Sequence, residues 1–492
     1  MAHVSEDVLD CDALTLSRRI HARSVSCREV MAATLARIDR LNPRVNAIVS
    51  RRDPDQVLAE AAAMDGRLAQ GRPLGWMHGF PQAPKDLAAA AGIVTTQGSP
   101  LFRQFVPAQD DLFVARIRAS GAVFLGKTNT PEFGLGSHTY NPVFGATGNA
   151  YDPALSAGGS SGGAAVALAL GLLPVADGSD LMGSLRNPAA FNNVYGFRPS
   201  PGRVPGVPAT ELFIKQMSTS GPMARTVADL ARLFSVMAGP DPRAPLCLDQ
   251  DPARFAGPLD RDVKGLRIGW LGDLGGHLAM EPGILDLCQS ALGVLEGLGC
   301  AVEPADPGFD LDELWSAWMV LRSFGIAGEH GPQYQDPAQR AQLKPEVVFE
   351  VEQGLALTGP QVFAASARRS AWYLRVLELF GRFDALALPS AQVFPFDKRL
   401  TWPRSVAGRT MDTYHRWMEV VVPASMAGAP AISVPAGFNG AGLPMGLQLI
   451  GRPRGDWELL QLAHAYDQAT RWPARRPPAW LAQVPAAGPH DS

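Results

Sequence analysis

Residues 158–188 read GGSSGGAAVALALGLLPVADGSDLMGSLRNP, two Gly/Ser-containing clusters on either side of an apolar run. Its first part, 158–163, is a Gly/Ser-rich segment that runs straight into an apolar helix expected to begin near Ala164. Glycines and serines also make flexible linkers, but a linker would not lead directly into a tightly apolar helix. We therefore expect a loop that exposes backbone amides and two hydroxyls at a positive helix end, which suits an anionic transition state.

A second cluster of the same kind, DGSDLMGSLRNP, follows at 177–188. The apolar run between the clusters, 164–176, holds Gly171 and Pro174. It is shorter than the roughly 20 residues that a bilayer requires. We expect it to be a buried helix.

The segment 121–128, GAVFLGKT, matches the spelling of a phosphate-binding P-loop. A P-loop needs a strand before its first glycine and an open loop between its glycines. Here 122–125 is itself the expected strand, and 111–120 has a helical pattern. The order is helix, strand and turn, so we reject a nucleotide site.

The segment 158–163 also contains G-x-S-x-G, the pattern of the α/β-hydrolase nucleophile elbow. An elbow follows a strand directly, whereas 149–157 has a loop-like composition. No histidine stands as an obvious base after an acid. An esterase of the α/β-hydrolase type therefore stays only as a weaker alternative.

Outside this region, helical and strand-like segments alternate. Helical spacing covers 14–41 and 57–68, and short β-rich runs occur at 122–125, 266–271, 385–388, 431–434 and 445–450. This alternation predicts an α/β sheet enzyme. The Pro/Ala-rich segment 472–492 is expected to be a loosely held tail.

The composition argues for a small, roughly neutral ligand. The net charge is −3 and Lys and Arg are scattered, so the sequence shows no footprint for nucleic acid or an anionic membrane. The five cysteines form no C-x-x-C and are odd in number, which favours reduced thiols and the cytoplasm. No basic leader or clustered His/Cys ligand set is present, so we expect neither export nor a metal.

Several separate motifs, in order, resemble the amidase signature family. Besides 158–163 and 183–188, they are GFPQAPKDL at 79–87, GKTNTPEF at 126–133, GFRPSPGRV at 196–204, AISVPAG at 431–437 and GLPMGLQLIG at 442–451. The likeness covers roughly Leu14 to Thr470. It implies a single α/β/α domain over 1–471, built around a large mixed β-sheet with helices on both faces. Within it we expect N-terminal helices at 14–70, a catalytic core at 75–235, a variable substrate-selecting region at 300–384 and C-terminal strands and a helix at 385–471.

The resemblance also implies a catalytic triad and no cofactor. Ser184 would be the nucleophile that forms an acyl-enzyme, Ser160 a bridging serine on a cis peptide, and Lys85 the base. Lysine is a base only when neutral, so its pKa must fall from about 10.4 toward the working pH, and burial lowers it. The apolar neighbours of Lys85 fit a desolvated ammonium, whereas Lys127 is expected to be structural.

The family pattern places an oxyanion hole at the backbone N–H groups of Leu181, Met182, Gly183 and Ser184. Family members usually carry Thr-Gly where this chain has Leu181-Met182, which puts the loop's dihedrals and the pocket's shape in question, since a β-carbon disfavours positive φ. Three further residues are expected to give structural support. They are Ser161 and the pair Asp180 and Arg186.

Substrate choice is the least determined feature. Gly134 and Gly136 lie in the block that borders the acyl pocket in similar enzymes. Trp315, Trp318 and Met319, like Trp372 and Tyr373, have a spacing that favours core packing over a pocket. We expect hydrolysis of apolar or aryl amides, with carbamates (urethanes) or esters open. The rivals are a glutaminase-like subunit of an amidotransferase complex and a non-catalytic relative, and a homodimer is open.

Overall fold

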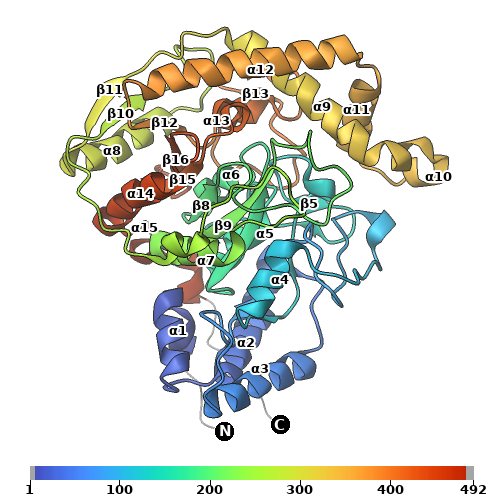
Figure 1. Cartoon of the computed structure of the whole chain (residues 1–492), viewed down its shortest axis with the longest axis vertical. Helices are drawn as coiled ribbons and strands as arrows, with labels where there is room; N and C mark the ends of the chain where they lie inside the picture. The colour runs from blue at the N-terminus through green and yellow to red at the C-terminus, as the bar shows by residue number, and fades with distance from the viewer. Residues whose placement is uncertain (1–5, 484–492) are drawn as a thin grey trace.

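Eight strands form one mixed sheet at the centre of the computed structural model, in the order β11-β10-β12-β16-β15-β8-β9-β7 (Figure 1). The structure describes residues 6–483. β10 runs parallel to β11 and β12, and all other neighbours are antiparallel. The strands are β7 (Val175–Asp180), β8 (Tyr195–Arg198), β9 (Thr219–Ala224), β10 (Arg267–Trp270), β11 (Ala301–Pro304), β12 (Ala385–Pro389), β15 (Ala431–Phe438) and β16 (Pro444–Gly451).

Helices cover both faces of this sheet. Successive residues of a strand point to opposite faces. In β8, a side chain at Gly196 would touch Ala189 of α6 (Arg186–Phe191), while the ring of Phe197 packs on Phe234 of α7 (Val227–Met237). The α6 face also carries α5 (Gly162–Ala169), and the α7 face carries α8 (Ile284–Gly297) and α14 (Asp456–Thr470). The expected α/β/α arrangement is confirmed.

The other helices surround this core. At the lower end of the molecule in Figure 1 are α1 (Ala13–His21), α2 (Cys27–Val45) and α3 (Pro54–Ala69). The capping box of Ser26 and Glu29 sets the start of α2. The remaining helices are α4 (Leu112–Ala119), α9 (Leu311–Gln335), α10 (Pro337–Arg340), α11 (Pro345–Leu355), α12 (Gly359–Phe380), α13 (Val422–Ala427) and α15 (Trp472–Arg475).

The expected buried helix over 164–176 is wrong in its second half. Helix α5 ends at Ala169, and β7 begins at Val175. Gly171 has a φ of +65°, which turns the chain out of the helix, and Pro174 lacks the N–H that a helix would use. The run is therefore helix, turn and strand, and all of it is buried or nearly so.

The start of the expected tail packs against the body of the protein. Trp480, in a short 3-10 helix (η6, Ala479–Gln483), donates its Nε1–H to Ala150 O over 2.7 Å. Arg44 of α2 lies over the same indole ring. Residues 472–483 are thus held by contacts rather than loose, because Trp472, Trp480 and Leu481 pack against the hydrophobic core. Residues 484–492 lie outside the described part.

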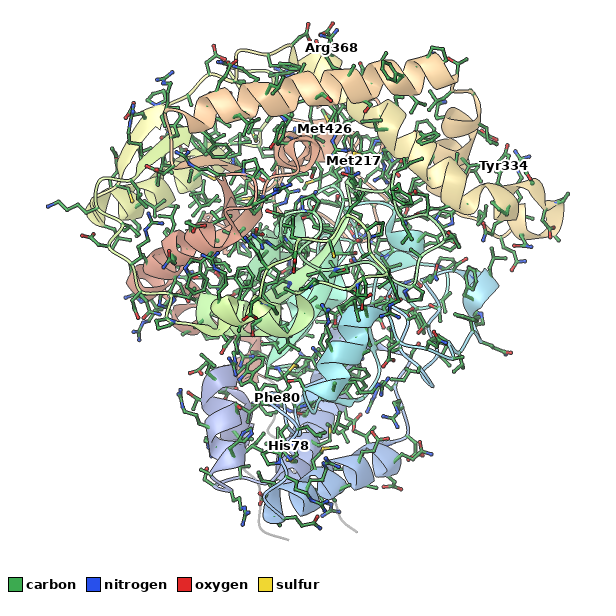
Figure 2. All side chains as sticks on the ribbon, in the orientation of Figure 1. His78, Phe80, Met217, Tyr334, Arg368 and Met426 are labelled. Atoms are coloured by element: carbon green, nitrogen blue, oxygen red, sulfur yellow. The ribbon has the colours of Figure 1, made fainter. Side chains whose placement is uncertain are left out.

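The tryptophans of the variable region pack in the core, as their spacing predicts. Trp315 and Trp318 of α9 are buried and stack 5.0 Å apart. Trp372 of α12 is buried and donates its indole N–H to Pro423 O, whereas Tyr373 is exposed. Figure 2 shows side chains filling the space beneath α12, with Met426 below that helix and Arg368 on its outer side.

All five cysteines are free thiols, as their odd number and spacing predict. Within 6–483, the structure contains no helix with the length and apolarity needed to span a bilayer.

Candidate active site

Lys85 follows β2 (Pro81–Gln82) and lies beside β4 (Lys127–Thr128). Asp86 N–H donates to Thr128 O over 3.0 Å, and Thr128 N–H donates to Pro84 O over 3.1 Å. These two bonds hold the backbone on either side of Lys85 in an extended form. The side chain is thereby directed into the protein, where only 1% of the residue's surface is exposed.

Three serine hydroxyls surround the Lys85 ammonium. Its Nζ lies 2.7 Å from Ser160 Oγ, 3.0 Å from Ser161 Oγ and 3.2 Å from Ser179 Oγ. Ser160 and Ser161 belong to the loop before α5, and Ser179 belongs to β7. A lysine with three hydroxyl partners is oriented closely by them, and each hydroxyl is able to exchange a proton with it.

The loop of Ser160 and the loop of Ser184 lie against each other. The peptide bond between Gly159 and Ser160 is cis, as the resemblance implied. Ser161 N–H donates to Ser184 O over 3.2 Å, which ties the loop before α5 to the loop between β7 and α6. The three residues expected to form the triad are therefore brought into one buried region from three separate segments.

Burial controls the charge of Lys85. Desolvation lowers its pKa from the ordinary value of 10.5 to about 7, while the negative charges of Asp177 and Asp180 act in the opposite direction. A large fraction of Lys85 is thus neutral near neutral pH. This is the property that a general base needs.

The loop before Ser184 turns at Gly183. This residue has a φ of +75°, and a β-carbon here would lie 2.9 Å from the Val421 side chain. Neither Leu181 nor Met182 has a positive φ. Their side chains therefore cause no backbone strain at the positions where family members usually carry Thr-Gly.

The four amides expected in the oxyanion hole are not equivalent. Gly183 N–H donates to Asp180 Oδ1 over 2.9 Å and is therefore occupied. For the amides of Leu181, Met182 and Ser184, the part of the chain that is described supplies no hydrogen-bond acceptor. Three of the four expected donors are thus free for a ligand.

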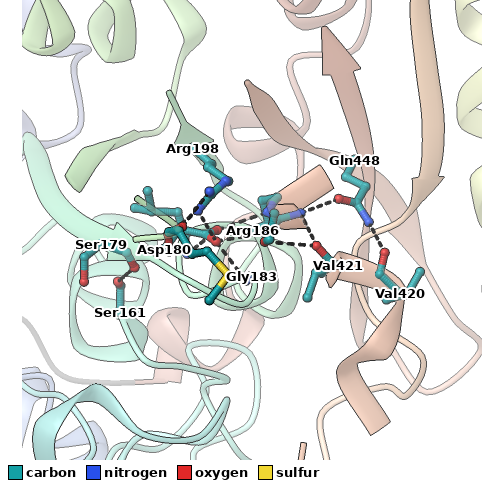
Figure 3. A network of polar contacts seen from close by, with 12 residues as sticks. Ser161, Ser179, Asp180, Gly183, Arg186, Arg198, Val420, Val421 and Gln448 are labelled. Atoms are coloured by element: carbon teal, nitrogen blue, oxygen red, sulfur yellow. Dashed lines mark hydrogen bonds and ion pairs between the residues drawn. The ribbon is translucent and has the colours of Figure 1, made fainter. Parts of the chain in front are cut away.

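Asp180 anchors this loop through a buried ionic network (Figure 3). Its carboxylate accepts from Arg186 Nε and Nη2, both over 3.0 Å, and Arg198 also pairs with it. Arg186 further donates to Val421 O and to Gln448 on β16. The expected pairing of Asp180 with Arg186 is present. It fixes the loop to the central sheet, because a bidentate pair constrains both partners.

Of the two glycines expected at the acyl pocket, Gly134 is adjacent to the reacting groups. A β-carbon on Gly134 would lie 3.6 Å from Ser160 Oγ and 2.7 Å from Leu87 Cδ1. A β-carbon on Gly136 would lie in ordinary contact with the Tyr414 ring, at 3.8 Å. Both residues have positive φ, which favours glycine, and at Gly134 the Leu87 side chain also leaves no room for a β-carbon.

Two other polar residues near these motifs are held in structural roles. His138 has both ring nitrogens engaged, one with Ser156 Oγ at 2.7 Å and one with Lys398 O at 3.0 Å. Burial lowers its pKa to about 4. Lys127 is buried and donates to Ala88 O, as expected of a structural lysine.

Sequence reasoning missed four residues of this region. Ser179 and Asp177 contact Lys85, and Arg198 and Gln448 complete the Asp180 network. The first two lie within the cluster at 177–188, so a search for every polar residue of that cluster would have found them. The contacts of Arg198 with Asp180 and of Gln448 with Arg186 depend on the order of the strands in the sheet, and no local sequence pattern predicts them.

A polar cavity of about 370 Å³ lies elsewhere, next to the 3-10 helix η5 (Arg416–Val421). Its walls include His277, Asp312, Arg409 and Glu419, and none of the triad residues. Among residues 6–483, no group of three His, Cys, Asp or Glu side chains is arranged to hold a metal ion.

Known proteins match this chain along most of its length. The amidase family model matches residues 29–460. An acylamidase of Rhodococcus erythropolis is 34% identical over 94% of this chain and 96% of its own length. A glutamyl-tRNA(Gln) amidotransferase subunit of Synechococcus sp. (strain CC9605) is also 34% identical, over 94% of this chain and 97% of its own length. The crystal structure of a bacterial aryl acylamidase of the amidase signature family superposes with a TM-score of 0.88 at 29% identity, and the match covers 95% of this chain and 98% of that chain. The chain belongs to the amidase signature family and is an amide-cleaving hydrolase.

Proposed function

We propose that this protein hydrolyses linear amides with apolar or aryl groups through a covalent acyl-enzyme on Ser184. The observation that carries the proposal is the 2.7 Å hydrogen bond between Lys85 Nζ and Ser160 Oγ, beside the loop of Ser184. A serine hydroxyl attacks an amide only when a base removes its proton and later returns it to the leaving amine.

In the proposed sequence, neutral Lys85 accepts the Ser160 proton while Ser160 accepts the proton of Ser184. The Ser184 oxygen then bonds to the amide carbon. The free amides of Leu181, Met182 and Ser184 stabilise the tetrahedral oxyanion. As the C–N bond breaks, the proton returns through Ser160 to the leaving amine. Water then attacks the acyl-enzyme by the same route and releases the acid.

The preference for aryl or apolar groups rests on the surroundings of Gly134. The Leu87 side chain packs against Gly134, 2.7 Å from where a β-carbon would lie, and so places an apolar group close to Ser160. The neighbouring Phe133 is partly exposed and stacks on His330 with ring centroids 4.2 Å apart. Aromatic and apolar walls with a few polar groups favour apolar ligands. Carbamates and esters share the same carbonyl chemistry and are further candidates.

A second candidate is the glutaminase-like role within an amidotransferase complex. It is favoured by the similarity to the Synechococcus protein, which equals that to the acylamidase in identity. The tryptophans that would argue for an apolar pocket are packed in the core. They therefore do not separate the two candidates, and substrate assays must do so.

The test combines active-site labelling with a substrate panel. A fluorophosphonate should modify Ser184 of the purified chain, as mapped by mass spectrometry. Ser184→Ala should abolish labelling, whereas Ser161→Ala, the matched control one residue from the bridging serine, should still be labelled at Ser184. Modification of Ser161 with Ser184 untouched would refute the assignment.

The panel contains an anilide, an aliphatic amide, a phenyl carbamate, a phenyl ester and glutamine. Turnover of the anilide above that of glutamine is expected. Turnover of glutamine, seen as ammonia release, with no turnover of the other four substrates would favour the amidotransferase role instead.

A further inference from the structure

Asp177 is a buried acid next to the catalytic lysine that has no role in the proposed reaction so far. It lies on β7, two residues before Ser179, and is completely buried. Its Oδ2 accepts the backbone N–H of Lys85 over 3.0 Å. Its other oxygen, Oδ1, has no partner among the described residues.

A backbone N–H needs only a neutral acceptor, and many side chains would supply one. Burying a carboxylate costs several kcal/mol unless nearby charges compensate for it. Asp177 forms no ion pair with a described residue, and one of its oxygens is left unpartnered. A purely structural need for an acceptor therefore does not explain an aspartate at this position.

The charges around Asp177 indicate what it does. Burial raises the pKa of Asp177, whereas the positive charges of Lys127 and Lys85 lower it, and the charge of Asp177 raises the pKa of Asp111. Two acids, Asp177 and Asp180, in turn raise the pKa of Lys85 through their charges. Asp180 is already compensated by two arginines. Asp177 has no such ion pair among the described residues, so it is the less compensated of the two acids whose charges act on the catalytic lysine.

We infer that Asp177 is a positioning residue for the catalytic step, which holds the Lys85 backbone and stabilises the side chain when it carries the proton taken from serine. This inference rests on the proposed function of Lys85. A base that receives a proton becomes a cation, and a nearby anion stabilises that cation. Without Asp177, Lys85 would be neutral at lower pH but would be a weaker base.

The test is Asp177→Asn, which keeps an acceptor for the Lys85 N–H and removes the charge. The midpoint of the kcat/KM–pH profile should fall by about half a pH unit or more. The rate on the alkaline plateau should also fall, by about threefold or more, because the base is weaker. Asp111→Asn is the matched control. It removes an acid whose charge acts on Lys127 but not on Lys85, and should leave the midpoint unchanged.

Asp177→Ser is a second neutral variant, in case the asparagine protein does not fold. Folding is judged by the far-UV circular dichroism spectrum and the urea-unfolding transition of each variant, neither of which depends on the reactivity of Ser184. An unmoved midpoint in a folded neutral variant would overturn the inference, and failure of both to fold would make Asp177 merely structural and overturn it too. Neither result touches the proposed function, which fails separately if the parent is not labelled at Ser184.

Discussion

Replacing Lys85 by methionine should change protein stability in opposite directions at low and high pH. Burial lowers the pKa of Lys85 from 10.5 to about 7. In this pH interval the unfolded chain binds one more proton than the folded chain, so the contribution of Lys85 to stability rises with pH. Below pH 7 the buried lysine is protonated, and its burial lowers the free energy of unfolding by about 5 kcal/mol, because the pKa falls from 10.5 to about 7 at about 1.4 kcal/mol per pH unit.

Methionine removes this cost but also the three hydrogen bonds to serine hydroxyls. At about 1 kcal/mol each, these bonds offset about 3 kcal/mol. At about pH 6, Lys85→Met should therefore be more stable than the parent by about 2 kcal/mol. At about pH 9 only about 2 kcal/mol of the lysine cost remains, so the variant should be less stable by about 1 kcal/mol.

The assay is urea unfolding of both proteins at the two pH values, followed by tryptophan fluorescence. The change between them, about 3 kcal/mol, is independent of the hydrogen-bond term because that term cancels. The exposed Lys264 provides the control, since Lys264→Met should give the same small difference at both pH values. A difference for Lys85→Met that does not vary with pH would refute the assignment of a depressed pKa to this lysine.

Three further predictions concern catalysis. The kcat/KM for an anilide should rise with pH through a single ionisation near 7, and His138→Gln should show the same ionisation. Lys85→Arg should lose activity, because a guanidinium stays protonated and cannot act as a base. Loss of the ionisation in His138→Gln would instead indicate a histidine base. EDTA should leave activity unchanged, and a loss restored by one metal would overturn the serine mechanism. Gly183→Ala should lower kcat by about tenfold or more, because the added β-carbon would collide with Val421 and displace the loop. Gly275→Ala is the control: this glycine also has positive φ but has nothing within 4 Å, so the variant should keep the parent kcat. Equal losses in both variants would show that crowding at Gly183 is unimportant.

The strands of the sheet differ in how clearly the sequence shows them. β12, β15 and β16 are recognisable because they are short apolar runs, buried on both faces. β7, with the sequence VADGSD, contains two aspartates and a glycine, which are rare in strands. It forms a strand because the antiparallel pairing with β9 and the helices beside it compensate for that weak propensity.

The sequence by itself determined the family and the motifs of the proposed site. Lys85, Ser160 and Ser184 stand in local motifs that resemble those of the amidase signature family, and that resemblance implies the roles proposed for them, because such motifs record residue type and the immediate backbone. The pairing of Asp180 with Arg186 could also be predicted, since the two flank one short loop between β7 and α6.

Only the tertiary structure decided how these residues are tuned. It placed Ser179 and Asp177 against Lys85, turned the Gly183 amide onto Asp180, and engaged both nitrogens of His138. Each of these contacts depends on where a loop is placed by the packing of strands and helices distant in the chain, or on a backbone turn that residue types do not specify. Local sequence carries no record of either, because the free energy that selects them comes from burial and hydrogen bonding across the whole core.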